Sequence, residues 1–538
     1  MKKRNILALI LSGVMLLGTA CGGGETPAAD VAQRELTEAE IQTISAAIPD
    51  YSASNKQYEF FGYSSASTGY WTDYGVEYYC GEDLRNVEQF KMYKDAGMTF
   101  MHPQSACAIE ANLPFQFSGS DLERVMDMAY EAGIDRVIVP DYRMNWLLSY
   151  ISSGIKAKEE NTFATYDDRY EVFTDEGELD ETALDERLQE YMGEYTKHPA
   201  YYGNVLKDEP QPKDFVGYGI VYRAIKKLYP DAFLLCNLFP VNAGMEYYTV
   251  GDGVTEEEKA EFTGTTSAER LANWKKYITT FIDETGVDYL SYDQYPLGSN
   301  GINPFYIRAL QVAVEVCKEK GVYFQMITQT MCLGETNTRI VSAKDAAWLN
   351  NMLLGMGVKT IGYFTYFDRE SGAEYFRDYG GFVTHFGEKT PLYDAMQTIM
   401  AQNQKMAPTL LSFEYQKSAV YMATGIKYSG EYINNALQSA AFTKVSSVAV
   451  DKESVLVSEM YDASNNRYLY MVQNIVDPVY TGAPSYQTTT LTFNEKYTHA
   501  LVLSEGKQTV VKLAEGETSQ YTVTQHPGKA VYVIPFAV

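Results

Sequence analysis

Two neighbouring acids stand at the end of a short apolar run, in the segment Val205-Leu206-Lys207-Asp208-Glu209-Pro210. Adjacent carboxylates repel each other, so at least one of them should have a raised pKa. A carboxyl group that keeps its proton near neutral pH can act as a general acid, which makes Glu209 a candidate proton donor. The alternative is that Asp208 and Glu209 are an ordinary pair of acids on a solvated loop.

Other polar residues follow further apolar runs of the chain in the same way. They are His102, Asp141, Asn237, Asp293, Tyr295, Gln329 and Asp368. The set contains no serine or cysteine nucleophile paired with a histidine base, and the five histidines lack the spacing of metal ligands. Glycoside hydrolysis works with two carboxyl groups and requires no metal and no cofactor. We therefore expect Asp293 to be the second carboxylate.

Eight apolar runs alternate with helical segments between residues 51 and 404. Strands are expected at Tyr58–Tyr63, Gly97–His102, Arg136–Pro140, Tyr202–Leu206, Ala232–Leu238, Asp288–Tyr292, Val322–Thr328 and Thr360–Tyr366. Short apolar runs without alternation are typical of parallel strands buried on both faces. Eight strand–helix units predict a (β/α)8 barrel, whose catalytic groups sit where the strands end. A doubly wound open sheet is the alternative, but it would need a glycine-rich first turn, which this sequence lacks.

The segments between these strands predict helices and two insertions. Helices are expected near Leu84–Ala96, Ser120–Ala132, Glu181–Thr196, Phe215–Leu228, Ala268–Thr285, Phe305–Lys320, Ala343–Gly355 and Pro391–Asn403. The insertions, residues 147–180 and 241–266, are expected to wall the substrate groove. Tyr70, Trp71 and Trp146 are aromatic residues that either stack on sugar rings or pack in the interior.

Residues 405–538 have a different pattern. Strand-like runs such as Ser454–Tyr461 and Gln487–Phe493 alternate with turn clusters, and no helical period interrupts them. This pattern predicts a C-terminal antiparallel β-sandwich behind the barrel.

The first twenty residues have the order of a secretory signal, with Lys2, Lys3 and Arg4 before an apolar stretch. The ending Leu17-Gly18-Thr19-Ala20-Cys21 resembles the lipobox of bacterial lipoproteins, which implies cleavage before Cys21 and lipid attachment to it. A plain signal cleaved near Ala20 is the alternative. Residues 21–50 would then be the lipidated cysteine and a flexible tether. We expect an exported protein that meets the cell membrane only through this anchor and faces outside.

The charge balance excludes one class of partner. Lys and Arg number 44 against 70 Asp and Glu, so the net charge is -26. Such a surface repels phosphate backbones, and nucleic-acid binding is therefore not expected. The 45 tyrosines suit the recognition of sugars but also suit ordinary cores.

The acidic segment resembles the Asn-Glu-Pro that ends strand 4 in clan A glycoside hydrolases, with Asp208 in place of the asparagine. This resemblance implies that Glu209 is the proton donor and that Asp208 contacts a sugar hydroxyl. The pair is also similar to the Asp-Glu of β-hexosaminidases, where the aspartate orients an acetamido group. The segments Leu290–Pro296 and Gly362–Asp368, with Asn237-Leu238-Phe239-Pro240, look like those of uncharacterised glycosidase-like proteins of gut bacteria, distantly related to family 42 β-galactosidases. Rings within Tyr363–Phe367, Tyr366 among them, would then form a sugar platform or pack in the core.

One departure from clan A leaves two classes of function open. Retaining members carry a nucleophilic glutamate at the end of strand 7, where this chain reads Met326-Ile327-Thr328-Gln329-Thr330. Glu335 follows six residues later and could reach in. With Glu209 and Asp293 as its carboxyl pair, the protein is expected to be a surface glycoside hydrolase acting on oligo- or polysaccharides. The alternative is a carbohydrate-binding lipoprotein that has a barrel groove without hydrolysis.

Overall fold

The computed structural model describes residues 38–538 except 66, 74–75, 112–113, 164–170, 250–256, 258–264, 304, 334–337, 369–377, 424–440, 480–485, 515 and 517. The predicted signal peptide, Cys21 and the first part of the predicted tether lie outside the described residues. The chain divides into two compact units. The α/β unit comprises Glu59–Ala346 and Gly357–Gln397, and the β unit comprises Ala347–Met356, Thr398–Val538 and the described residues up to Tyr58.

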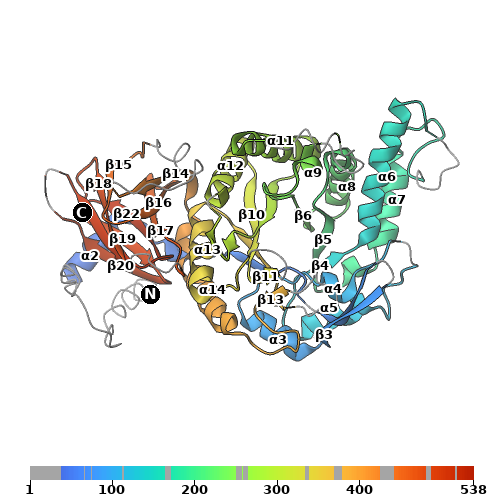
Figure 1. Ribbon diagram of the computed structural model, residues 1–538, viewed down its shortest axis with the longest axis horizontal. Coiled ribbons are helices and arrows are strands. Elements are labelled where there is room, and N and C mark those ends of the chain that lie inside the picture. The colour runs from blue at the N-terminus through green and yellow to red at the C-terminus, as the bar shows by residue number, and fades with distance from the viewer. Residues whose placement is uncertain are drawn as a thin grey trace. The chain divides into compact units, whose positions relative to one another are not determined.

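Two parallel sheets form the centre of the α/β unit (Figure 1). One sheet has the order β1-β12-β10-β7 and the other the order β4-β5-β6. The strands are β1 (Glu59–Gly62), β4 (Val137–Pro140), β5 (Tyr201–Asp208), β6 (Phe233–Asn237), β7 (Tyr289–Gln294), β10 (Tyr323–Gln329) and β12 (Thr360–Phe364). Seven of the eight predicted strands therefore form, each within a few residues of its expected bounds. These strands are buried on both faces of their sheets, which explains why each one appears in the sequence as a continuous apolar run.

Backbone hydrogen bonds connect the two sheets along both of their edges. Leu238 N donates to Ser291 O over 2.9 Å, which joins the end of β6 to β7. On the other side, Thr99 N donates to Phe60 O in β1, and Ile138 N in β4 donates to Met101 O, at 2.8 and 3.0 Å. The predicted strand Gly97–His102 thus lies between β1 and β4, although it makes only the single bridge Met101–Val137 instead of a full strand.

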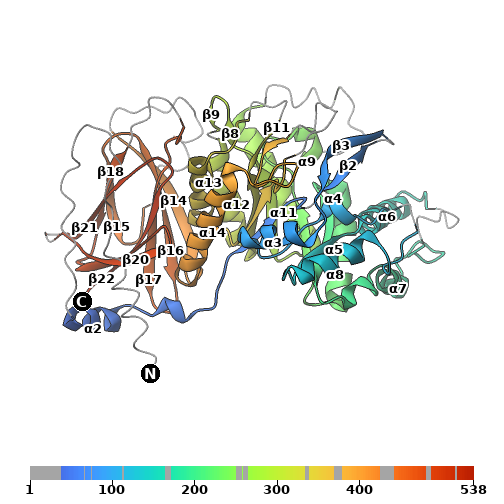
Figure 2. The ribbon, with the colours of Figure 1, turned by 90° about the horizontal axis from the view of Figure 1, so that it is seen from below.

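Helices surround the strands of the α/β unit (Figures 1 and 2). They are α3 (Val87–Asp95), α4 (Gln104–Cys107), α5 (Asp121–Glu131), α6 (Tyr142–Glu159), α7 (Glu181–Met192), α8 (Phe215–Leu228), α9 (Met245–Thr249), α11 (Ser267–Thr285) and α12 (Phe305–Lys320), with the short helices η3 (Tyr195–Lys197) and η4 (Pro212–Asp214). Two further helices, α13 (Ala343–Gly355) and α14 (Pro391–Leu410), begin in the α/β unit, but most of their residues belong to the β unit. The first part of the predicted insertion 147–180 is helical, because α6 begins directly after β4 and ends at Glu159. Within the described residues, none of the helices combines the length and apolar character that a membrane crossing requires.

Small antiparallel pairs extend the loops that follow the strands. The hairpin β2 (Thr68–Asp73) and β3 (Val76–Asp83) follows β1, and the other pairs are β8 (Leu297–Gly298) with β9 (Gly301–Ile302) and β11 (Met331–Leu333) with β13 (Asp378–Gly380). Figure 2 shows β2, β3, β8, β9 and β11 on the same side of the α/β unit. The sequence predicts no strand at the position of β2 and β3, so this hairpin is an addition to the expected elements.

Two antiparallel sheets make up the β unit. Their orders are β14-β16-β17-β22-β19-β20 and β15-β18-β21. The strands are β14 (Glu414–Met422), β15 (Val445–Val450), β16 (Ser454–Asp462), β17 (Arg467–Asn474), β18 (Gln487–Phe493), β19 (His499–Ser504), β20 (Lys507–Lys512), β21 (Gln520–Gln525) and β22 (Ala530–Phe536). Side chains of both sheets, such as Val472 and Leu491, share one buried apolar cluster. The unit also contains η1 (Tyr51–Ala53) and α2 (Glu38–Ala47), so the last part of the segment expected to be a tether is helical.

Candidate active site

A β-bulge in β5 turns Asp208 toward the interior of the sheet. Val205 pairs with Leu235 and lies in the interior apolar cluster, but the register shifts before Lys207. Successive strand residues point to opposite faces, so the extra residue Leu206 reverses which face each later residue occupies. Lys207 therefore points outward to Asp214, at 3.4 Å. Asp208 points inward and pairs with Asn237 of β6.

Tyr63 holds the inward-facing carboxylate of Asp208. Its hydroxyl donates to Asp208 Oδ2 over 2.7 Å from the end of β1. Glu209 follows with φ +46°, in the left-handed region that residues other than glycine rarely adopt. Its N–H donates to Asn237 O over 2.7 Å. This turn lets two consecutive acids lie close to the same third acid, Asp293, which a regular strand would not allow.

Asn237 connects the acids of β5 and β7. Its Nδ2 donates to Asp293 Oδ1 over 3.0 Å, and the same side chain hydrogen-bonds to Asp208. The buried Oδ1 of Asn237 has no partner among the described residues. The hydroxyl of Tyr295 donates to Asp293 as well. Asp208, Glu209 and Asp293 thus gather at the carboxyl ends of parallel strands, and amide and hydroxyl donors hold two of them.

The surroundings raise the pKa of all three carboxyl groups. Burial, followed by the charges of Asp293 and Asp208, raises the pKa of Glu209 to about 9. Burial and the charge of Asp208 raise the pKa of Asp293 to about 7, although the hydrogen bonds from Asn237 and Tyr295 lower it. Asp208 has surface exposed to solvent, yet the protein atoms crowded around it raise its pKa too. Near neutral pH Glu209 therefore keeps its proton, and Asp293 is partly ionised.

A row of rings lies beside the acids. Tyr295 stacks on Phe364 with ring centroids 5.4 Å apart, Phe364 lies 5.8 Å from Tyr63, and Tyr63 lies 4.3 Å from His102. His102 is fully buried and accepts a 3.1 Å hydrogen bond from Ser64 N at Nδ1. Burial lowers its pKa to about 3, so the imidazole is neutral. His102 therefore supports Tyr63 rather than carrying charge to the site.

Asp141, a sequence candidate for substrate binding, faces away from the acids. Ile138 of β4 lies in the interior cluster, and a residue three positions later points to the opposite face. The buried carboxylate of Asp141 caps α6, pairs with Arg143 at 2.7 Å and accepts from Tyr195 Oη at 3.1 Å. These contacts give Asp141 a structural role.

Gln329 and Tyr366, two further candidates for substrate binding, make hydrogen bonds and ring contacts within the protein. Gln329 Oε1 accepts from Leu297 N over 2.9 Å, and its Nε2 donates to Met331 O over 3.0 Å. Tyr366 is buried, with its ring 4.8 Å from Tyr93 and 5.3 Å from Phe382. These contacts occupy the polar side-chain atoms of Gln329 and bury the ring of Tyr366.

Asp368 organises a loop after β12. Its Oδ1 accepts from His385 N and lies 2.8 Å from His385 Nδ1. The alternative second acid, Glu335, lies outside the described residues. No group of three or more histidine, cysteine or acidic residues in the described part of the chain has the arrangement of a metal site.

Tyr63 and Phe364 belong to the site but are not among the residues predicted from the sequence. A signal for Tyr63 was present, because Phe61 and Tyr63 are two residues apart and share the inward face of β1. Phe364 lies within the aromatic run Tyr363–Phe367, where the sequence does not distinguish one ring from another. Of the sequence candidates, the structure brings together Asp208, Glu209, Asn237, Asp293 and Tyr295, with His102 behind them.

No family model and no curated protein sequence matches this chain. Among solved structures, the chain is similar to a family 39 glycoside hydrolase from Bacteroides cellulosilyticus WH2, with a TM-score of 0.40 and 11% identity over 89% of this chain and 81% of that one. A glucosidase from Croceicoccus marinus matches with a TM-score of 0.40 and 10% identity over 90% and 96% of the two chains. A GH30 endoxylanase from Clostridium papyrosolvens C71 matches with a TM-score of 0.37 and 12% identity over 90% of this chain and 97% of that one. These neighbours are glycoside hydrolases, but similarities this weak assign neither fold nor activity to this chain. The link to family 42 remains a resemblance of short motifs.

Proposed function

We propose that this protein is a glycoside hydrolase that cleaves O-glycosidic bonds of oligo- or polysaccharides with two carboxyl groups. The observation that carries the proposal is the position of Glu209 beside Asp293 at the ends of β5 and β7, with burial and two neighbouring acids keeping Glu209 protonated. A protonated acid near an ionisable carboxylate is the pair that glycoside hydrolysis uses.

In the proposed reaction Glu209 gives its proton to the glycosidic oxygen as the bond to the anomeric carbon breaks. Asp293 then either attacks the anomeric carbon or takes a proton from a water that attacks it. In the first case, water later hydrolyses the ester with Glu209 as base. Asp208, with solvent-exposed surface and its Oδ2 fixed by Tyr63, would accept a hydrogen bond from a sugar hydroxyl. The distance between the two carboxyl groups decides between the routes, about 5–5.5 Å for retention and about 6.5–9.5 Å for inversion.

We also propose that the two parallel sheets form one closed (β/α)8 barrel. The backbone hydrogen bonds between β6 and β7, and those of residues 99–101 with β1 and β4, support this arrangement. Catalytic groups of such barrels lie at the carboxyl ends of the strands, as Asp208, Asn237 and Asp293 do here. The lipobox-like segment before Cys21 supports the further proposal that the enzyme is exported and anchored to the outer face of the cell membrane.

A carbohydrate-binding protein without hydrolysis is the second candidate. The residue at the end of β10 favours this candidate, because a retaining clan A enzyme would carry its nucleophilic glutamate there. Here Gln329 occupies that place and is bonded to the backbone of Leu297 and Met331.

The test is cleavage of a broad panel of glycans by residues 26–538, beside the variant Glu209→Gln. A general acid contributes about 10²–10⁴-fold, so the variant should lose at least a hundredfold. The anomer of the product, followed by NMR, assigns the role of Asp293. Binding of a glycan by both proteins without cleavage supports the second candidate, and equal cleavage by both contradicts the role of Glu209.

A further inference from the structure

The hairpin of β2 and β3 combines exposed aromatic rings with acidic residues. Residues Thr68–Asp83 include five aromatic and four acidic side chains and neither lysine nor arginine. Of those rings whose side chains the structure describes, Tyr70 is 54% exposed and Tyr79 is 43% exposed. Tyr70 and Tyr79 share one hairpin, so their exposed rings make a candidate contact surface for a ligand.

Tyr70 and Tyr79 face each other across the two strands. They are direct partners in the register, and their rings meet edge to face with centroids 5.7 Å apart. Such a cross-strand pair stabilises the hairpin, but it leaves both rings partly exposed. A tyrosine ring offers a flat apolar face for the C–H groups of a sugar ring and a hydroxyl for its hydrogen bonds.

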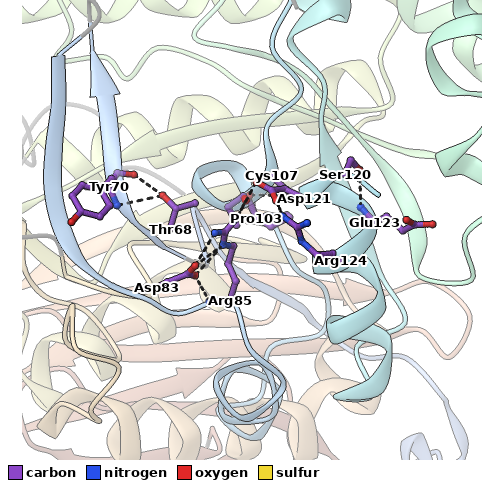
Figure 3. A network of polar contacts seen from close by, with 11 residues as sticks. Thr68, Tyr70, Asp83, Arg85, Pro103, Cys107, Ser120, Asp121, Glu123 and Arg124 are labelled. Atoms are coloured by element: carbon purple, nitrogen blue, oxygen red, sulfur yellow. Dashed lines mark hydrogen bonds and ion pairs between the residues drawn. The ribbon is translucent and has the colours of Figure 1, made fainter. Parts of the chain in front are cut away.

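The base of the hairpin is fixed, so the rings are held in place before any ligand binds. Arg85 contacts Asp83 at 2.7 Å and Asp121 of α5 at 3.1 Å, and it also donates to Ala106 O in α4 (Figure 3). On the other side, Glu82 N donates to His385 O over 2.8 Å. Gly81 permits this contact, because a Cβ there would lie 2.3 Å from His385 O.

The hairpin also rises from the edge of the sheet that carries the acids. Tyr63, the partner of Asp208, precedes Thr68 by five residues, and five extended residues span at most about 18 Å. Figure 2 shows the hairpin on the same side as β8, β9 and β11, which follow β7 and β10. A chain of several sugar units bound at the acids can therefore extend over the hairpin.

We propose that Tyr70 and Tyr79 form an accessory platform for an extended, neutral polysaccharide whose reacting bond lies at Glu209. This inference rests on the proposed function and names its substrate class. The four acids of the hairpin, together with a net charge of -26, would repel a polyanionic chain. Stacking on the rings would add affinity only for chains long enough to reach them.

The experiment measures binding to soluble neutral mannan, xylan, galactan and glucan and to anionic polygalacturonate. All proteins carry Glu209→Gln, so the polymers stay intact. Tyr70→Thr and Tyr79→Thr remove a ring but keep a residue that favours strands. The matched control is Tyr130→Thr, because Tyr130 is 51% exposed but lies at the end of α5 that leads into β4. We expect a neutral polymer to bind, with about tenfold weaker affinity in either hairpin variant and no change in the control.

A second measurement separates this inference from the proposed function. In the active protein, the ratio of kcat/KM for the polymer to kcat/KM for a disaccharide of the same linkage should fall about tenfold in Tyr70→Thr. Equal ratios in wild type and variant, a preference for polygalacturonate, or cleavage of short glycosides with no polymer binding would each overturn the platform while leaving hydrolysis intact. Failure of hydrolysis itself would appear as no cleavage of the disaccharide panel.

Discussion

Asn237 donates its side-chain amide to Asp293 Oδ1 over 3.0 Å, and this one contact ties the end of β6 to the end of β7. The same residue hydrogen-bonds to Asp208 through its side chain and accepts from Glu209 N through its backbone. One residue thereby contacts all three acids, two through its side chain and one through its backbone. Because a hydrogen bond to an ionised carboxylate favours the charged form, Asn237 also opposes the burial that raises the pKa of Asp293.

Replacing Asn237 by Leu should move the acidic limb of the pH profile of kcat/KM upward by about one to two units. A hydrogen bond to a charged group is worth about 1.5–3 kcal/mol, and one pKa unit corresponds to about 1.36 kcal/mol. Loss of the donor raises the pKa of Asp293, so a higher pH is needed to ionise it. The control is Asn145→Leu, since Asn145 contacts Lys207 on the outer face of β5. An unchanged limb would mean that Asn237 does not act through Asp293.

The wild-type pH profile should be bell-shaped. Below about pH 7 Asp293 takes up a proton and can no longer act as base or nucleophile. Above about pH 9 Glu209 loses the proton that the leaving group needs. The two limbs report apparent values of the coupled acids. Glu209→Gln should remove the alkaline limb together with most of the activity, whereas Glu186→Gln, an exposed change on α7, should keep both limbs. An alkaline limb that persists in Glu209→Gln would assign it to another group.

The proximity of the acids of β5 and β7 could be predicted from the sequence, because residues that follow parallel strands lie at one edge of the sheet. The direction in which each side chain points could not be predicted in this way. Asp208 faces inward only because Leu206 is bulged, and a bulge depends on how β5 pairs with β6. Asp141 follows an equally plausible strand, yet it lies on the outer face and caps α6. Strand-end position alone could not distinguish these two aspartates.

Elements were predictable where the local pattern was strong. The helices Phe215–Leu228 and Phe305–Lys320 have the expected bounds, since apolar residues recur at helical spacing and charged residues end each helix. The hairpin of β2 and β3 was missed, because its aromatic and acidic residues show no burial pattern that a sequence rule can detect. Its base depends on contacts of Arg85 with residues more than twenty positions away.

Asp141→Ala should lower stability without changing KM for any substrate. The change leaves the guanidinium of Arg143 without its buried partner, a loss of about 3–5 kcal/mol, and removes the cap of α6. Asp180→Ala is the matched control, because Asp180 caps α7 through bonds to Thr182 N and Ala183 N and forms no ion pair with any residue that the structure describes. That cap should be worth only about 1 kcal/mol. Thermal unfolding and substrate titration of both variants measure stability and KM. A KM that rises in Asp141→Ala alone would show that Asp141 contributes to substrate binding.

Gln329→Glu tests whether the end of β10 can supply the nucleophile of retaining clan A enzymes. The amide of Gln329 donates to Met331 O, and its Oε1 accepts from Leu297 N, so the side chain is already fixed between two loop backbones. A carboxylate would place negative charge against a carbonyl oxygen and leave a buried acceptor without its donor, at a cost of about 1–3 kcal/mol. We expect a lower melting temperature and no gain in the rate of cleavage. Rates are compared on an activated aryl glycoside, where a nucleophile would appear as a burst of released phenol. A burst in Gln329→Glu that is absent from wild type would show that this strand end can reach the sugar.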